Sequence, residues 1–219
     1  MNNKILSTFC LFLLIVVFAK AQAPFYNDVQ HFKKLDSAHF PAKHAILFVG
    51  SSSFTKWTDV QDYFPGYAII NRGFGGSSLP DVIWYASDII FPYQPRQIVI
   101  YCGENDLASA DTVTATMVVD RFKKLFVLIR QQLPTATVTF VSLKPSPSRQ
   151  RLWPKMIEVN TQIKNYLRKK KKTAFIDVYQ KMFNKDGTVM QDIFIEDNLH
   201  MNAKGYAIWQ KIMTPYLQK

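Results

Sequence analysis

The chain has 219 residues and a formal net charge of +11 at pH 7, with 27 Lys and Arg against 16 Asp and Glu. This length supplies one hydrophobic core rather than two, so we expect one domain. The positive charge could indicate an anionic partner, but no nucleic-acid motif or aromatic interleaving accompanies it, so we exclude a nucleic-acid partner. The densest basic cluster, Arg168 to Lys172, falls at the end of a predicted helix and is interpreted as a solvated helix end. Weak attraction to acidic glycans or membrane surfaces stays open.

The N-terminus has the pattern of a secretory signal peptide. Lys4 precedes an apolar run from Ile5 to Phe18, and Ala19-Lys20-Ala21 follows it. A transmembrane helix needs about 20 apolar residues, so this shorter run predicts cleavage after Ala21 rather than an anchor. We therefore expect a signal peptide over 1–21, one domain over 22–219 with a charge of +9, and a secreted or periplasmic protein without an integral membrane segment.

Cleavage would leave Cys102 as the only cysteine, which excludes an intrachain disulfide in the mature chain. Cys102 lies in an apolar run beside a glycine, so we interpret it as a small buried hydrophobic residue rather than a catalytic thiol. His31, His39 and His44 precede the first predicted strand and are expected at the surface. No His, Cys and carboxylate cluster has metal-ligand spacing, so we expect no metal and no cofactor.

Short β-branched runs alternate with longer segments of helical period, which predicts an α/β fold with a parallel sheet and helices on both faces. The predicted strands are Ala45–Val49, Ala68–Asn71, Gln97–Tyr101, Thr137–Leu143 and Ala174–Val178. The predicted helices are Ser53–Asp62, Pro80–Ile90, Thr112–Gln132, Pro154–Lys172 and Ala203–Leu217. Pro80 and Pro154 suit the first turn of a helix, and Asn202 suits an N-cap.

The first two predicted strands each end in small residues. Gly50-Ser51-Ser52-Ser53 would deliver a serine to the carboxyl edge of the sheet, beside free N–H groups that can stabilise an oxyanion. Serine is also a common N-cap. The second strand ends in a turn with Gly73, Gly75 and Gly76, where the backbone can approach a ligand closely. The spacing differs from a dinucleotide fingerprint, and a plain strand-to-helix turn is the alternative.

Three further segments carry polar residues at this edge. Gly103-Glu104-Asn105-Asp106 follows the third strand, and the Asn105 amide could donate hydrogen bonds to an oxyanion; an ordinary turn is the alternative. Lys144 to Arg149 is the one Pro/Ser-rich segment. Its position after the fourth strand favours a pocket wall with Lys144 and Arg149 as candidate substrate-binding residues, and a plain connection without a function is the alternative. Asp197-Asn198-Leu199-His200 precedes the last helix, and its spacing lets a carboxylate fix the tautomer of an imidazole.

Taken together, these blocks resemble the SGNH (GDSL-like) hydrolase family of the secreted bacterial type over nearly all of the mature chain. The matching positions are Gly50-Ser51-Ser52, Gly76, Gly103-Glu104-Asn105-Asp106 and Asp197-Asn198-Leu199-His200. The resemblance implies a three-layer, flavodoxin-like fold with a five-stranded parallel sheet. It implies Ser52 as nucleophile, His200 as base and Asp197 as its orienting group, with Ser52, Gly76 and Asn105 as the oxyanion hole. Ser51 stands where the family usually has Asp.

The sequence thus predicts a serine esterase that forms an acyl-enzyme. A short acyl group, acetyl on a carbohydrate, is favoured by secretion, compact size and the lack of an extended apolar lid. The expected partner is a small-molecule or glycan ester. A phospholipid or lysophospholipid acylhydrolase and a catalytically silent glycan-binding module stay open as alternatives, and the sequence does not determine the oligomeric state.

Overall fold

A five-stranded parallel sheet forms the centre of the protein. The computed structural model describes residues 23–219, so the predicted signal peptide lies outside the described residues. The strands are β1 (Ile46–Gly50), β2 (Ile69–Gly73), β3 (Gln97–Tyr101), β4 (Thr137–Val141) and β5 (Thr173–Ile176). Their order across the sheet is β2-β1-β3-β4-β5, the doubly wound order of flavodoxin-like folds. The predicted α/β fold with five parallel strands is confirmed.

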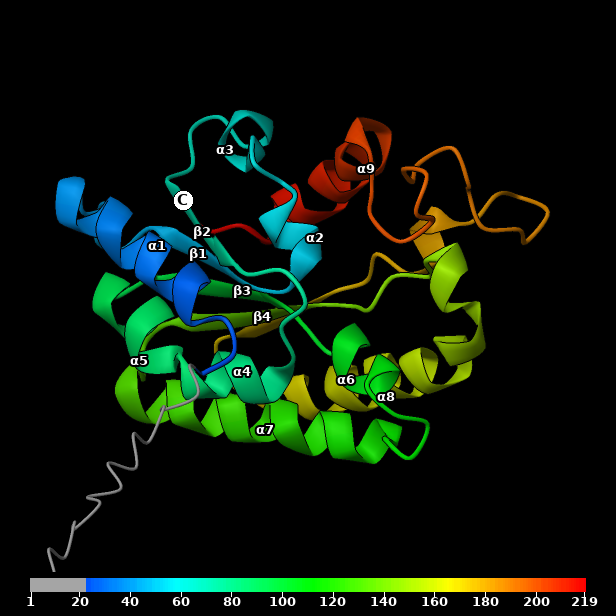
Figure 1. Cartoon of the computed structure of the whole chain (residues 1–219), viewed down its shortest axis with the longest axis horizontal. Helices are drawn as coiled ribbons and strands as arrows, with labels where there is room; N and C mark the ends of the chain where they lie inside the picture. The colour runs from blue at the N-terminus through cyan, green and yellow to red at the C-terminus, as the bar shows by residue number, and fades with distance from the viewer. Residues whose placement is uncertain (1–22) are drawn as a thin grey trace, which may run out of the picture.

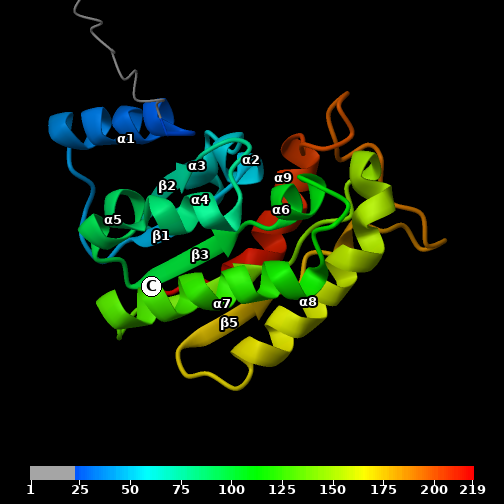
Figure 2. The ribbon, with the colours of Figure 1, turned by 60° about the horizontal axis from the view of Figure 1, so that its bottom comes forward.

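Helices cover both faces of the sheet, which gives three layers (Figures 1 and 2). The α-helices are α1 (Tyr26–Ala38), α2 (Ser52–Thr55), α3 (Val60–Tyr63), α4 (Leu79–Trp84), α5 (Ala86–Ile89), α6 (Glu104–Ala108), α7 (Ala115–Gln132), α8 (Trp153–Leu167) and α9 (Ala203–Met213). The 3₁₀ turns are η1 (Phe91–Tyr93), η2 (Pro147–Leu152), η3 (Gln180–Met182) and η4 (Thr214–Tyr216). Helices α4, α5, α7 and α8 pack on one face, and α2, α3 and α9 pack on the other (Figure 1).

The alternation of side chains along each strand builds two cores. In β1, Leu47 and Val49 belong to the core beneath α4, α5, α7 and α8, whereas Ile46 and Phe48 belong to the core beneath α2, α3 and α9. Successive strand residues point to opposite faces, and both faces are covered, so every residue of β1 is buried. This double coverage explains why β1 is a continuous apolar run. Cys102 is fully buried, as predicted.

Helix α1 was not among the predicted elements. Among its residues only Val29 is fully buried, so its sequence carries too narrow an apolar stripe to give a clear helical period. Phe32 packs against the core from this helix, and polar contacts add to this: the Tyr85 hydroxyl donates to the carbonyl of Pro24 just before the helix at 2.7 Å, and Arg72 pairs with Asp36. His31 lies on this helix and is exposed, as are His39 and His44, which agrees with their expected surface position.

Several boundaries differ from the predicted ones. The predicted helix Ser53–Asp62 is divided into α2 and α3, and the predicted helix Pro80–Ile90 is divided into α4 and α5. Strand β4 ends before Leu143, because the N–H of Leu143 donates to the Asn160 side chain instead of a neighbouring strand. Helix α8 ends at Leu167, so the basic cluster lies in the turn just beyond the helix. That turn ends with Lys172 in the left-handed region, at φ 52°, where the chain reverses into β5.

The three residues assigned to helix starts are confirmed, although α7 begins at Ala115 rather than at Thr112, with Thr114 as its N-cap. Pro80 and Pro154 lie in the first turns of α4 and α8. Asn202 caps α9, since its side-chain oxygen accepts hydrogen bonds from the N–H groups of Lys204 and Gly205. The cap fixes the point at which the last loop, which carries His200, enters the final helix.

Candidate active site

The turn after β1 presents one of three consecutive serines. Gly50 has φ 136°, and a Cβ atom there would lie 1.9 Å from the Tyr101 carbonyl oxygen, so this crossing needs glycine. Ser51 and Ser53 are 3% and 1% exposed, whereas Ser52 is half-buried at the start of α2. The Tyr206 hydroxyl donates to the Ser53 carbonyl at 2.9 Å and holds the turn from the side of α9. Only the middle serine therefore faces outward.

The loop before α9 brings an imidazole to this serine. Ser52 Oγ lies 2.8 Å from His200 Nε2, and His200 Nδ1 lies 2.5 Å from Asp197 Oδ2. The other Asp197 oxygen accepts the backbone N–H groups of Leu199 and His200, each at 2.9 Å. The carboxylate thus fixes both the ring and the backbone that carries it. An imidazole held in this way is oriented to accept the serine proton through Nε2.

The charge on Asp197 is secured by these hydrogen bonds. Partial desolvation raises the pKa of this carboxyl, but hydrogen bonds from the His200 ring and from the backbone N–H groups of His200 and Leu199 outweigh it and lower the pKa to about 2. Asp197 is therefore ionised throughout the neutral range. An ionised acceptor keeps the proton of the imidazole on Nδ1 and leaves Nε2 free to act as a base.

Three N–H donors converge on the same edge of the sheet. In the part of the chain that the structure describes, the backbone N–H groups of Ser52 and Gly76 have no hydrogen-bond acceptor. The neighbouring Gly75 lies beside the turn that carries Ser52, because a Cβ atom built on it would be 4.0 Å from Ser52 Cβ. Asn105 Nδ2 donates one hydrogen to the Ser77 carbonyl at 3.0 Å, which orients the amide and leaves its second hydrogen available. Such preorganised donors are suited to an oxyanion.

Asp106, which follows Asn105, acts inside the structure. Its side chain is fully buried, with Oδ2 accepting the Leu79 N–H at 2.9 Å and Oδ1 paired with Arg121 at 2.8 Å. Burial raises the pKa of Asp106, although Arg121 and the Leu79 N–H act in the opposite direction. The residue ties the segment of Asn105 to the start of α4, and it thereby supports the glycine turn that precedes α4.

The two candidate substrate-binding residues occupy different environments. The Lys144 side chain is 1% exposed and its ammonium lies 3.1 Å from Glu104 Oε2, so in this structure it is committed to an internal ion pair. Arg149 is half-buried at the other end of the same loop. The N–H of Ser148 donates to the Asn198 carbonyl at 3.0 Å, which joins this loop to the loop of His200.

Residues that brace the site had not been singled out in the sequence. Glu104 lies beside Asn105 in the quoted motif, but its partner Lys144 is 40 residues away, so the motif alone gives no sign of the pair. The hydroxyl of Tyr101 donates to Glu104 and completes this buried cluster. For Tyr206, the only feature in the sequence that could have indicated its role is its position in the apolar stripe of α9. A partner that is distant in the sequence leaves no local pattern.

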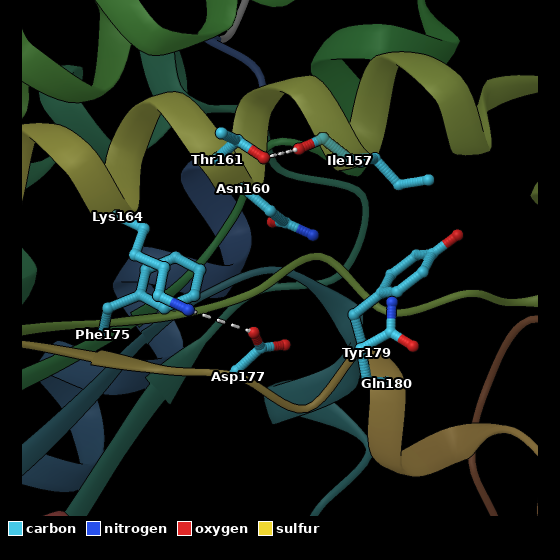
Figure 3. A pocket seen from close by; sticks show the side chains of 8 residues that line it. All are labelled: Ile157, Asn160, Thr161, Lys164, Phe175, Asp177, Tyr179 and Gln180. Carbon is cyan, nitrogen blue, oxygen red and sulfur yellow. Dashed lines mark hydrogen bonds and ion pairs between the residues drawn. The ribbon is translucent and has the colours of Figure 1, made fainter.

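A separate cavity of about 120 Å³ lies between α8 and β5 (Figure 3). Lys164 and Asp177 form an ion pair across it at 3.6 Å, and Tyr179 closes one side. It contains none of the predicted site residues. Within residues 23–219, no helix is long and apolar enough to cross a membrane, and no group of three or more His, Cys, Asp or Glu side chains could hold a metal ion.

Comparison with known proteins identifies the family of this chain. Residues 47–208 match the model of the GDSL-like Lipase/Acylhydrolase family. The chain therefore belongs to this family, and the protein is a serine ester hydrolase. No curated protein matches the chain.

Solved structures share the fold at low sequence identity. A GDSL-like lipase from Bacteroides thetaiotaomicron has a TM-score of 0.73 and 18% identity, and the match covers 86% of this chain and 96% of that one. A catalytic mutant of an acetylxylan esterase from Geobacillus stearothermophilus has a TM-score of 0.62 and 13% identity, with 80% and 94% covered. A lipase/acylhydrolase from Enterococcus faecalis has a TM-score of 0.59 and 18% identity, with 80% and 97% covered.

Proposed function

We propose that the protein hydrolyses a carboxylic ester through an acyl-enzyme on Ser52. The observation that carries this proposal is the continuous hydrogen-bonded chain from Ser52 through His200 to Asp197. His200 takes the hydroxyl proton as Ser52 attacks the carbonyl carbon, and it returns the proton to the leaving alcohol. Water then attacks the acyl-enzyme with His200 again as base, which releases the acid and regenerates Ser52.

The negative charge of each tetrahedral intermediate falls on the former carbonyl oxygen. We assign the N–H groups of Ser52 and Gly76 and the free amide hydrogen of Asn105 as its donors. Two of these are backbone groups held by the turns after β1 and β2, and the third is oriented by its bond to Ser77. Donors that are already in position need no reorganisation when the charge develops, which is the main electrostatic advantage of such a site.

For the substrate, we propose a short acyl group, acetyl, on a carbohydrate. One structural neighbour is an acetylxylan esterase, and the predicted signal peptide would place the protein outside the cytoplasm, where polysaccharides are encountered. Other neighbours are described as lipases, which favours a lipid ester as the second candidate. Aryl esters of increasing acyl length separate the two: the proposal requires rates that fall sharply beyond the shortest acyl groups.

A fluorophosphonate probe tests the assignment of the nucleophile. Intact-mass spectrometry should show one adduct on the unmodified protein and none on Ser52→Ala. Ser51→Ala and Ser53→Ala serve as matched controls, because their side chains are buried away from the site, and both should still be labelled. An adduct on Ser52→Ala would disprove the assignment. A folded, unmodified protein that neither labels nor hydrolyses any ester would favour the silent glycan-binding module.

A further inference from the structure

The loop Lys144–Arg149 is held in one conformation beside the site. Its two prolines restrict the backbone, the N–H of Arg149 donates to the Ser146 carbonyl at 3.0 Å, and Trp153 Nε1 donates to the same carbonyl at 3.1 Å. A loop fixed in this way presents its side chains without a large ordering cost on binding.

This loop is attached directly to the loop that carries the imidazole. Ser148 donates its N–H to Asn198, which lies between Asp197 and His200 and has a left-handed backbone at φ 54°. Arg149 is therefore one residue away from a backbone contact with the histidine loop. Both loops follow strands at the carboxyl edge of the sheet (Figure 1), where open α/β sheets bind their ligands.

Among the described residues Arg149 has no acidic partner, unlike three other arginines: Arg72 pairs with Asp36, Arg121 with Asp106 and Arg151 with Asp111. Arg96 also has a buried Nε without an acceptor, but it directly precedes β3 and so lies at the amino end of the sheet, away from the predicted site. Within residues 23–219, no ion pair or hydrogen bond involves the guanidinium of Arg149, and its Nε is buried without an acceptor. Ser146 Oγ in the same loop is also buried and unpartnered.

Two unsatisfied polar groups in one rigid loop are unfavourable unless something else satisfies them. A buried donor without an acceptor costs free energy, which a ligand can recover by supplying the acceptor. The ligand must be an anion or a strong acceptor, because a guanidinium only donates. The other cation of the loop, Lys144, is already neutralised by Glu104, so the loop offers one net positive charge.

We propose that Arg149 binds a carboxylate on the alcohol part of the ester, which makes acetylated acidic glycans the substrate class. This inference rests on the proposed esterase function. The planar fork of a guanidinium matches the two oxygens of a carboxylate, and one positive charge matches one carboxylate. The net charge of +11 on the whole chain, or +9 on residues 22–219, also attracts acidic polymers over distance.

The test compares Arg149→Gln with Arg151→Gln, whose side chain is 63% exposed and paired with an exposed Asp111. Substrates are acetoxybenzoates, which carry a carboxylate, and their neutral methyl esters. We compare kcat/KM for the acid with kcat/KM for its methyl ester. In Arg149→Gln this ratio should fall about 10- to 100-fold, which is the usual contribution of a charge-assisted hydrogen bond. The ratio should not change in Arg151→Gln. An unchanged ratio in Arg149→Gln, or equal losses on both esters, would overturn the proposal.

Polymeric substrates extend the test. Acetylated polygalacturonate should be deacetylated in preference to acetylxylan, and the preference should disappear in Arg149→Gln. A selective loss of activity on short-chain phosphatidylcholine alone would assign Arg149 to a headgroup phosphate and would refute the carboxylate. If the protein hydrolyses no ester, calorimetry with the Ser52→Ala variant and oligogalacturonate tests the anion site separately from the esterase activity. Binding that is lost when Arg149→Gln is added supports the anion site, and absence of binding rejects it.

Discussion

The internal ion pair between Lys144 and Glu104 gives the sharpest stability prediction. The two side chains are 1% and 6% exposed, and Lys144 Nζ lies 3.1 Å and 3.3 Å from the two carboxylate oxygens. Burial raises the pKa of Tyr101 well above its usual range, so this hydroxyl stays protonated and donates to Glu104. Every charged group in the cluster thus has a partner.

The Lys144→Met substitution keeps the apolar stem and removes the charge. It leaves Glu104 as a buried anion with only neutral donors, and breaking such a pair from one side costs about 3–5 kcal/mol. The double variant Lys144→Met/Glu104→Gln removes both charges and lets the amide oxygen still accept from Tyr101. Its free energy of unfolding should return to within about 1–2 kcal/mol of the unmodified protein, since replacing both charges is often close to neutral.

Urea denaturation measures these free energies. Lys123→Met is the matched control, because Lys123 and its partner Asp120 are 41% and 54% exposed, and an exposed pair contributes at most about 1 kcal/mol. If Lys144→Met costs no more than Lys123→Met, or if the double variant is less stable than the single one, the reasoning about an uncompensated buried charge is wrong.

Three further predictions concern the site. Asn105→Ala should lower kcat about 100- to 1000-fold, as loss of one oxyanion donor does in other enzymes, while circular dichroism should show an intact fold. A decrease in kcat of less than tenfold would show that Asn105 is not part of the oxyanion hole. Gly50→Ala should yield no soluble folded protein in expression trials, because its Cβ would overlap the Tyr101 carbonyl, and a stable, active variant would contradict this geometry. The Asp197 carboxylate has a pKa lowered from 3.8 to about 2, so it stabilises the fold above pH 3.8 and this contribution is lost as the pH falls toward 2. This group is 42% exposed, so the effect of pH should be small. The difference in unfolding free energy between the unmodified protein and Asp197→Asn should decrease by only about 1 kcal/mol between pH 6 and pH 2. A difference that does not change with pH would refute the assignment.

The sequence by itself predicted the architecture because local signals are strong there. Buried parallel strands are continuous apolar runs, and each of the five was placed to within about two residues. Caps and first-turn prolines act within a single turn, so Asn202, Pro80 and Pro154 could be assigned without a structure. The topology of a doubly wound sheet then collects the carboxyl ends of the strands at one edge, which is why four short motifs could be predicted to meet.

The elements that were missed or displaced depend on contacts with distant residues. Helix α1 has a weak apolar stripe and is held by partners such as Tyr85 and Arg72, which lie far along the chain. The strand β4 stops early because of the Asn160 side chain, which comes from α8. Such contacts leave no periodic pattern in the sequence.

The same distinction separates the two candidate substrate-binding residues. Lys144 and Arg149 are equally basic and belong to one loop, so composition and position gave no reason to distinguish them. Only the tertiary structure shows that Lys144 points into the core toward Glu104, 40 residues earlier. Arg149 lies near the loop of His200 and has no partner among the residues that the structure describes. The charge of a side chain is fixed by its chemistry, but the partner that neutralises it is fixed by how the strands and loops are brought together in folding.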